Sequence, residues 1–425
     1  MDASKKLIVG YDLCEDYALI SCFSYKSMEP VPISVREGED DYLLPTVLCM
    51  KNETKQWLFG KDAIACAKNG EGILVEQLLK KAQLSQKVEL LGKEYSGVAL
   101  LEKYLRKTLM LIKNYFPTEP ITKLVVTVRN AEPSLVDKIY EALSLLGLEK
   151  DRAFVINHAG AYLYYTLSQD KVLWMNDVGL FDFTEEGLSY YQMTVNRRVK
   201  PMIAGLIKKE LTDTLNMNML KDRLIDPSGA NPAYIFENLA NTVLYKQTIT
   251  TLYFTGMGFE GGWADEVIRR LCVGRRVFVG QNLYTKGACY AARELSGDRK
   301  LEEYLLLSDD MLSSNVTLRV YCDTAYKELP ILQAGDNWYE VDRSIEVIPE
   351  GKAELEINTL NIMSRATTRE ILTIDQFPKR PERMTRLILH ITCKDKHTCL
   401  ITVTDLGFGD FYQGSGQVAE YTIEF

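Results

Sequence analysis

Two aspartates, each close to the end of an apolar segment, are the residues in this sequence best suited to hold a cation. Asp12 lies near the end of the segment 7–13, and Asp182 lies near the end of the segment 178–183. A carboxylate at the end of a buried strand can orient a divalent cation or the water molecules around it. The alternative is local, because aspartate also suits a turn by bonding to its own backbone.

The turns that follow these two aspartates carry acidic side chains. Glu15 and Asp16 follow the first aspartate, and Glu185 and Glu186 follow the second. A turn that grips phosphate needs small residues, so that backbone N–H groups can approach the anion. Each like-charge contact at 4 Å costs on the order of 1–4 kcal/mol, whereas micromolar affinity is only about 8 kcal/mol. Several such contacts would remove the affinity for a phosphate ligand, so we predict no catalytic residue here. We also predict that the turn acids are solvated and are not metal ligands, with no bound metal.

A glycine-rich loop is a further candidate for contact with a nucleotide. Gly256 and Gly258 follow the apolar segment 251–255 and precede a segment with helical periodicity. Such a loop can line an adenosine pocket, although it can also serve close packing alone. The candidate cofactor-binding residues are therefore Asp12, Asp182, Gly256 and Gly258.

Three regions of different sequence pattern must position these residues. Residues 1–170 begin with strand-like segments and continue with helical periodicity over 62–114. Residues 171–308 repeat the order of strand hairpin, helix, strand and helix, with a helix expected over 201–223. Residues 315–425 contain short alternating segments separated by turns. The repetition predicts an internal duplication around a cleft, and the last region predicts an all-β sandwich.

The composition is that of an ordinary globular protein, with 46% hydrophobic and 25% charged residues. The net charge of −8 argues against general binding of nucleic acid or of an anionic membrane. Residues 1–6 run directly into a strand-like segment, so we expect no signal peptide, and no apolar run approaches the length of a membrane span. The nine scattered cysteines indicate reduced thiols and a cytoplasmic location.

Several segments occur in the same order as the motifs of a known family. Residues 9–13 resemble its first phosphate loop, and residues 155–162 resemble the start of a helix. Residues 181–182 resemble its second phosphate loop, residues 254–258 its adenosine loop and residues 286–292 its last helix. This order is similar to that of the seventy-kilodalton heat-shock chaperones, within the actin and sugar-kinase ATPase superfamily. The resemblance implies an α/β actin-like duplicated nucleotide-binding-type domain, with lobe I over 1–170 and a trimmed lobe II over 171–308. It also implies an all-β sandwich over 315–425 that resembles a chaperone substrate-binding domain.

The departures from this family fall at its catalytic positions. His158 stands where the family has a connecting glutamate, and Arg129 stands where it has a proline. The position of its catalytic lysine falls near Leu78, with Lys80 and Lys81 only loosely in register. We interpret His158 as a capped or core histidine rather than as a catalyst.

The resemblance also suggests peptide-binding residues in the sandwich. Tyr321, Leu355 and Ile357 fall near positions that resemble the family's peptide-binding arch and pocket. The alternative is that these residues form the core, because apolar residues on alternating strands usually do so.

Together these patterns favour a non-catalytic chaperone-like or scaffold protein, with a degenerate ATPase domain and a β-sandwich that binds a protein or an extended peptide. We expect no cofactor, no nucleic-acid partner and no membrane partner. One alternative is a divergent ATP-binding chaperone with residual ATPase activity, which would bind Mg-ATP. Another is an actin-like filament protein or a cell-division-associated protein.

Overall fold

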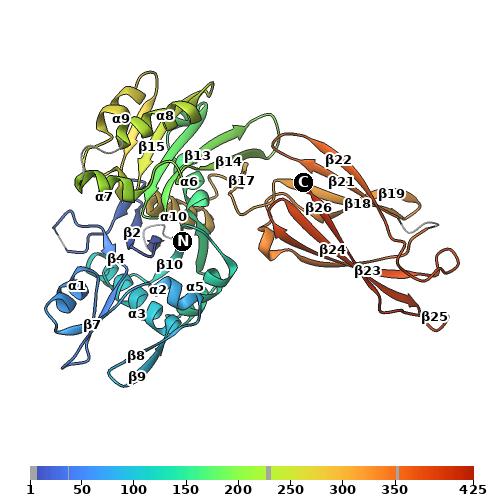
Figure 1. Ribbon diagram of the computed structural model, residues 1–425, viewed down its shortest axis with the longest axis horizontal. Coiled ribbons are helices and arrows are strands. Elements are labelled where there is room, and N and C mark those ends of the chain that lie inside the picture. Colours follow the sequence, from blue (N-terminus) through green and yellow to red (C-terminus); the bar gives the residue numbers. More distant parts are fainter. Residues whose placement is uncertain (1–6, 37, 226–230, 351–353) are drawn as a thin grey trace. The chain divides into compact units, whose positions relative to one another are not determined.

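The fold was analysed in a computed structural model of the chain (Figure 1). The residues that it describes are 7–36, 38–225, 231–350 and 354–425. Residues 1–6, on which the expectation of no signal peptide rests, lie outside the described residues. None of the helices in the described part of the chain combines the length and the apolar character that a membrane crossing requires.

The chain is a mixed α/β protein with several sheets, and it divides into two compact units. The first unit contains residues 1–195 and 206–304, and the second contains residues 196–205 and 305–425. The division near residue 305 lies close to the predicted start of the sandwich. The two predicted lobes, by contrast, belong to the same compact unit.

The first large sheet is built around one fully buried strand. β1 (Leu7–Leu13) pairs in antiparallel fashion with β2 (Tyr17–Ser24) and in parallel fashion with β10 (Ile121–Val128). β11 (Ala153–Asn157) extends the sheet beside β10, and β3 (Glu29–Pro32) extends it beside β2. All seven residues of β1 are buried, as expected for a central strand that is covered on both faces.

The second large sheet has the same strand order around its own buried strand. β12 (Asp177–Thr184) pairs in antiparallel fashion with β13 (Gly187–Asn196) and in parallel fashion with β15 (Ile249–Thr255). β16 (Arg276–Val279) follows β15 in parallel pairing, and β14 (Met202–Glu210) is the neighbour of β13. This repeated order places Asp12 and Asp182 at equivalent positions. Each aspartate has a threonine as its neighbour on the parallel strand, and these are Thr127 and Thr255.

Helix α10 (Leu283–Arg293) packs closely against β1 and α6 (His158–Leu167). Glycine permits both approaches. A Cβ atom at Gly10 would lie 2.3 Å from the backbone oxygen of Thr285, and one at Gly287 would lie 2.0 Å from the backbone oxygen of Ala161. These contacts fix the two helices against the strand that carries Asp12.

Smaller elements surround the two sheets of the first unit. Its other helices are α1 (Gly60–Lys68), α2 (Leu78–Gln83), α3 (Gly97–Met110), α4 (Ile112–Tyr115), α5 (Pro133–Ser144), α7 (Met217–Ile225), α8 (Pro232–Leu244) and α9 (Asp265–Leu271). Its short strands are β4 (Leu44–Pro45), β5 (Leu48–Lys51), β6 (Trp57–Phe59), β7 (Gly72–Val75), β8 (Lys87–Leu90) and β9 (Lys93–Ser96). Proline at the first position of α5 and of α8 suits a helix start, because that position has no intrahelical partner for an N–H group.

Two of the predicted helical stretches are wrong in part. The helix expected over 201–223 is strand β14 over its first half, and only α7 is helical. The stretch 62–114 is interrupted by β7 and by the β8–β9 hairpin. Both errors have one physical cause, because short apolar runs look alike in a strand and in a helix, and only tertiary packing decides between them.

The described residues of the second unit are all-β apart from one short 3₁₀ turn, as predicted for this region (Figure 1). One sheet has the order β19 (Ala325–Leu332), β18 (Ser314–Cys322), β21 (Glu354–Asn361) and β22 (Thr367–Thr373). The other sheet contains β20 (Asp342–Val347), β23 (Arg386–Asp395), β24 (Thr398–Phe408), β25 (Tyr412–Gln413) and β26 (Val418–Glu424). Apolar residues from both sheets form a single core. The second unit resumes at residue 305, and residues 305–307 belong to β17 (Tyr304–Leu307).

A buried ion pair between Arg380 and Asp405 connects the segment before β23 with the end of β24. Arg380 donates to both carboxylate oxygens of Asp405, at 2.6 and 2.7 Å. The same carboxylate accepts hydrogen bonds from the backbone of Gly407 and from the backbone and hydroxyl of Ser415. The Asp405 side chain is fully buried. Its hydrogen bonds, that from Arg380 first, hold the pKa of Asp405 far below its usual range although burial opposes this.

Candidate functional site

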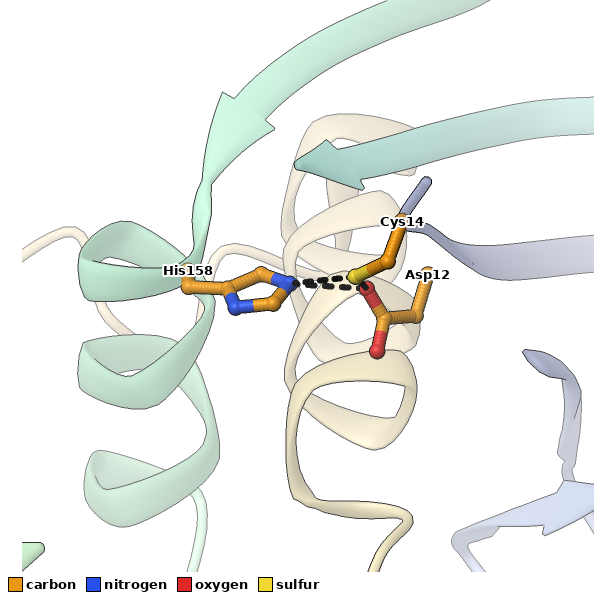
Figure 2. A group of neighbouring side chains, drawn as sticks. All are labelled: Asp12, Cys14 and His158. Atoms are coloured by element: carbon orange, nitrogen blue, oxygen red, sulfur yellow. Dashed lines mark hydrogen bonds and ion pairs between the residues drawn. The ribbon is translucent and has the colours of Figure 1, made fainter. Parts of the chain in front are cut away.

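The candidate site begins with a buried pair between Asp12 and His158 (Figure 2). Nε2 of His158 lies 2.8 Å from Oδ1 of Asp12, and the two side chains are 2% and 0% exposed. His158 is the first residue of α6, and the side chain of Asn157 caps this helix by accepting a bond from the Gly160 N–H group. The helix start therefore sets the position of the imidazole opposite the end of β1.

Cys14 completes a three-residue group at the end of β1. Its Sγ atom donates to Oδ1 of Asp12 at 3.6 Å and lies 3.7 Å from Nε2 of His158 (Figure 2). Burial, and after it the nearby Asp12 carboxyl, raises the pKa of the Cys14 thiol well above its usual value. Without a bound cation, Cys14 is therefore a neutral thiol.

Tyr284 connects this group to the second aspartate. The Tyr284 ring stacks on the His158 ring with 3.7 Å between their centroids, and its hydroxyl donates to Oδ2 of Asp182 at 2.7 Å. Burial raises the pKa of Asp182 and that of Tyr284. The four side chains Asp12, His158, Tyr284 and Asp182 thus form a continuous buried chain between the two large sheets.

Arg129 joins the two acidic turns. It follows β10 directly, and its guanidinium donates to both carboxylate oxygens of Asp16, at 2.9 and 3.0 Å. It also donates to Glu186 at 2.7 Å. The Arg129 side chain is only 12% exposed. One buried cation therefore bridges the turn after β1 and the turn after β12.

The other two acids of these turns also have partners. Glu15 accepts a bond from the backbone N–H group of Lys80 in the first turn of α2, at 3.0 Å. Glu185 accepts two bonds from Lys221, both at 3.1 Å. Asp16, Glu185 and Glu186 are thus exposed turn acids that also pair with cations of the protein. Arg129 and Lys221 offset part of the charge of the four acids, so the expected repulsion of phosphate is weaker, whereas an incoming ligand would have to displace existing ion pairs.

Two small cavities flank Arg129. One has a volume of about 340 Å³ and is lined by Cys14, Glu15 and Lys80, among others. The other has a volume of about 240 Å³ and is lined by His158 and Asp182, among others. Arg129 lines both cavities. Ligand pockets usually measure about 300–1,000 Å³, so each space lies at or below the lower end of that range.

The glycine loop is occupied by packing against Phe183. A Cβ atom at Gly256 would lie 2.2 Å from the backbone oxygen of Phe183, and one at Gly258 would lie 2.5 Å from the Phe183 ring. Gln281 exchanges hydrogen bonds with the backbone N–H and C=O groups of Gly256. Neither glycine lines the two cavities beside Arg129. The close-packing interpretation accounts for both glycines without a nucleotide.

The region aligned with the family's catalytic lysine contributes the backbone N–H group of Lys80, which also lines one of the two cavities beside Arg129. Leu78 is fully buried, Lys80 is exposed, and Lys81 donates its ammonium group to the backbone oxygen of Glu76.

The three predicted peptide-binding residues do not lie together on an accessible surface. Leu355 and Ile357 are buried in the core between the two sheets of the second unit. They cannot contact a peptide on the surface, so the core interpretation describes them. Tyr321 is 57% exposed at the end of β18, and its ring packs edge-on against Tyr326 at 5.2 Å between centroids.

Four residues of this site were not recognised as participants from the sequence. Arg129 and His158 drew notice only as departures from the family pattern. Tyr284 stands directly before an expected helix and carries no motif of its own. Cys14 lies two residues after Asp12. This spacing could have indicated in the sequence that the two side chains lie together, because alternate residues of a strand share a face.

The fold and the site define a mixed α/β protein whose two strand-end aspartates are engaged by the protein's own side chains. The chain belongs to a family of unknown function (DUF5716, C-terminal), whose profile matches residues 29–309. A domain of unknown function (DUF8552) matches residues 311–425, which is the region of the sandwich. A comparison with curated proteins gives no match.

Proposed function

We propose that this protein is a non-catalytic, chaperone-like scaffold, with an actin-like core that works without nucleotide and a β-sandwich that binds extended polypeptide. The observation that carries this proposal is the engagement of both strand-end aspartates. His158 bonds to Asp12, Tyr284 bonds to Asp182, and Arg129 bridges the adjacent turns. The repeated strand order of the two sheets supports the actin-like assignment.

A nucleotide bound between the two turns would gain phosphate contacts and displace existing ion pairs. To place phosphates between the two turns, the bonds of Arg129 to Asp16 and Glu186 would have to break. Arg129 is 12% exposed, but Asp16 and Glu186 are 32% and 58% exposed, so breaking each pair costs on the order of 1 kcal/mol. That cost is subtracted from the roughly 8 kcal/mol of a micromolar complex. A nucleotide therefore gains less net free energy here than at turns with free backbone N–H groups.

Calorimetric titration of the purified chain with ATP and magnesium tests the core of this proposal. We expect no binding heat up to millimolar ATP, while circular dichroism shows that the protein is folded. Micromolar binding would instead favour the divergent ATP-binding chaperone. Asp12 and Asp182, each with one buried oxygen that lacks a partner among the described residues, would then be the first residues to replace.

A groove in the second unit supports the polypeptide-binding part of the proposal. It has a volume of about 1190 Å³ and is lined by one face of the β19–β18–β21–β22 sheet together with residues 199–203. This volume exceeds that of most small-molecule pockets. The lining is mixed, with apolar residues such as Ile203 and Leu360 beside the cations Lys200, Arg365 and Arg369. An extended chain with apolar and acidic side chains fits such a surface.

Replacing Thr367 with tryptophan should weaken binding of a permanently unfolded polypeptide at least tenfold, or about 1.4 kcal/mol. Thr367 is exposed and lines the groove, so a bulky side chain there would fill it. The measurement is fluorescence anisotropy of a labelled, reduced and alkylated polypeptide added to the full chain. Thr422→Trp is the matched control, because Thr422 is an exposed threonine on the other sheet. Equal effects of the two variants would refute a role for the groove.

A further inference from the structure

The group formed by Asp12, Cys14 and His158 also has the ligand chemistry of a metal centre. A carboxylate oxygen, a thiol sulfur and an imidazole nitrogen lie within 4.8 Å of one another, and all three residues are buried. Thiolate, imidazole and carboxylate together are the ligand set of zinc-type ions, whereas magnesium prefers oxygen ligands alone. We propose that these three side chains bind a single zinc-type divalent ion.

The spacing of the three ligand atoms agrees with a single shared ion. With typical zinc bond lengths and tetrahedral angles, sulfur and nitrogen should lie about 3.6 Å apart, sulfur and oxygen about 3.5 Å, and nitrogen and oxygen about 3.3 Å. The corresponding distances here are 3.7, 3.6 and 2.8 Å (Figure 2). An ion therefore requires only a small separation of Asp12 from His158.

Independent support comes from buried oxygens without partners. Among the residues that the structure describes, Oδ2 of Asp12 and Oδ1 of Asp182 are buried and have no hydrogen-bond partner. The nearest fixed cation on the adjacent turns, Arg129, is used by Asp16 and Glu186. A divalent ion would compensate this negative charge, since buried charges in proteins are paired or coordinate metals. The three protein ligands leave a fourth position for water, as in many zinc sites.

Binding would tie two elements that are distant in the sequence. Asp12 and Cys14 stand at the end of β1, and His158 opens α6, so the ion would cross-link the sheet to the helix. The Cys14 thiol would release its proton to solvent when it binds the ion, so uptake should be accompanied by acidification of an unbuffered solution. The site goes beyond the proposed scaffold function and was not expected from the sequence, because the ligand spacing of 2 and 144 residues matches no common motif.

Cobalt substitution tests this proposal directly. The full chain carrying Cys272→Ser and Cys322→Ser, which removes the two exposed thiols, would be treated with chelator, desalted and titrated with Co²⁺ alone. We expect one equivalent to bind, with a thiolate-to-cobalt absorption band and visible bands of tetrahedral intensity. Zn²⁺ should displace the cobalt. No nucleotide is present, so this result is independent of the ATP titration.

Two ligand variants and one matched control identify the site. Cys14→Ser should abolish the thiolate band, and His158→Gln should lower metal affinity at least tenfold. His390→Gln should change neither, although His390 also pairs with an aspartate, Asp342, at 2.7 Å. If both ligand variants fail to fold, the thermal unfolding of the unaltered chain tests the proposal. Zn²⁺ should raise the midpoint temperature of unfolding, and chelator should reverse the change. A folded chain that takes up no metal, or one whose uptake survives both ligand replacements, would overturn the proposal.

Discussion

Replacement of His158 with alanine should lower the free energy of unfolding of the metal-free first unit by about 3–5 kcal/mol, the usual cost of removing one partner of a buried pair. Among the described residues, Asp12, which is fully buried, would keep the Cys14 thiol, a weak donor, as its hydrogen-bond partner. The stacking surface of Tyr284 would also face a cavity. Urea unfolding followed by hydrogen exchange of peptides from β1 and β12 would measure the loss within this unit.

The protein contains its own control for this experiment. His390 and Asp342 form a similar pair at 2.7 Å, but their side chains are 46% and 79% exposed. His390→Ala should therefore cost less than about 1 kcal/mol, since exposed ion pairs contribute little. If the two alanine variants lost equal stability, burial would not be what gives the Asp12–His158 pair its importance. Asp12→Asn should lower the free energy of unfolding less in a His158→Gln variant than in the unaltered protein.

Replacement of Asp405 with asparagine should destabilise the second unit by a similar 3–5 kcal/mol at neutral pH. The change removes the charge that pairs with Arg380 and turns one hydrogen-bond acceptor into a donor that faces the Ser415 donors. Hydrogen exchange of β24 and β26 peptides would report the effect. Asp410→Asn, which alters an exposed residue of the same segment, should change stability by no more than about 0.5 kcal/mol.

The pH dependence of the Asp405 effect has a definite sign. The folded-state pKa of Asp405 is depressed, so its contribution to stability is fully present above its unfolded pKa, which is near 3.9. That contribution is lost as the pH falls toward the folded value. The stability difference between Asp405→Asn and the unaltered protein should therefore shrink below about pH 4. A difference that stayed constant down to pH 2 would contradict the role of the ionised carboxylate.

The sequence predicted the elements whose patterns are local. Buried strands such as β1 and β12 are continuous apolar runs, and the short strands of the second unit alternate in character. The edge strand β19 has no such alternation between core and solvent over residues 325–329, because these residues are exposed or only partly buried. The strand β14 was mistaken for a helix because its apolar residues fit both periods.

The candidate site was predictable only in part. Asp12 and Asp182 were recognised because each ends a buried strand, which is a local property. Their partners could not be recognised, because His158 and Tyr284 lie more than 100 positions away from the aspartates they serve. A pattern within one segment contains no information about such a contact. The electrostatic argument counted the acids of the two turns without the distant Arg129, which pairs with two of them.

The bridge made by Arg129 differs from a bound ligand because it belongs to the same chain. A cleft held closed by a bound ligand opens and closes with the concentration of that ligand, by mass action. Here the bridging group is part of the same chain, so its effective concentration is constant and independent of the metabolic state of the cell. The contact between the turns after β1 and β12 thus behaves as a permanent internal ligand. Ionic strength and mutation are variables that would change this contact.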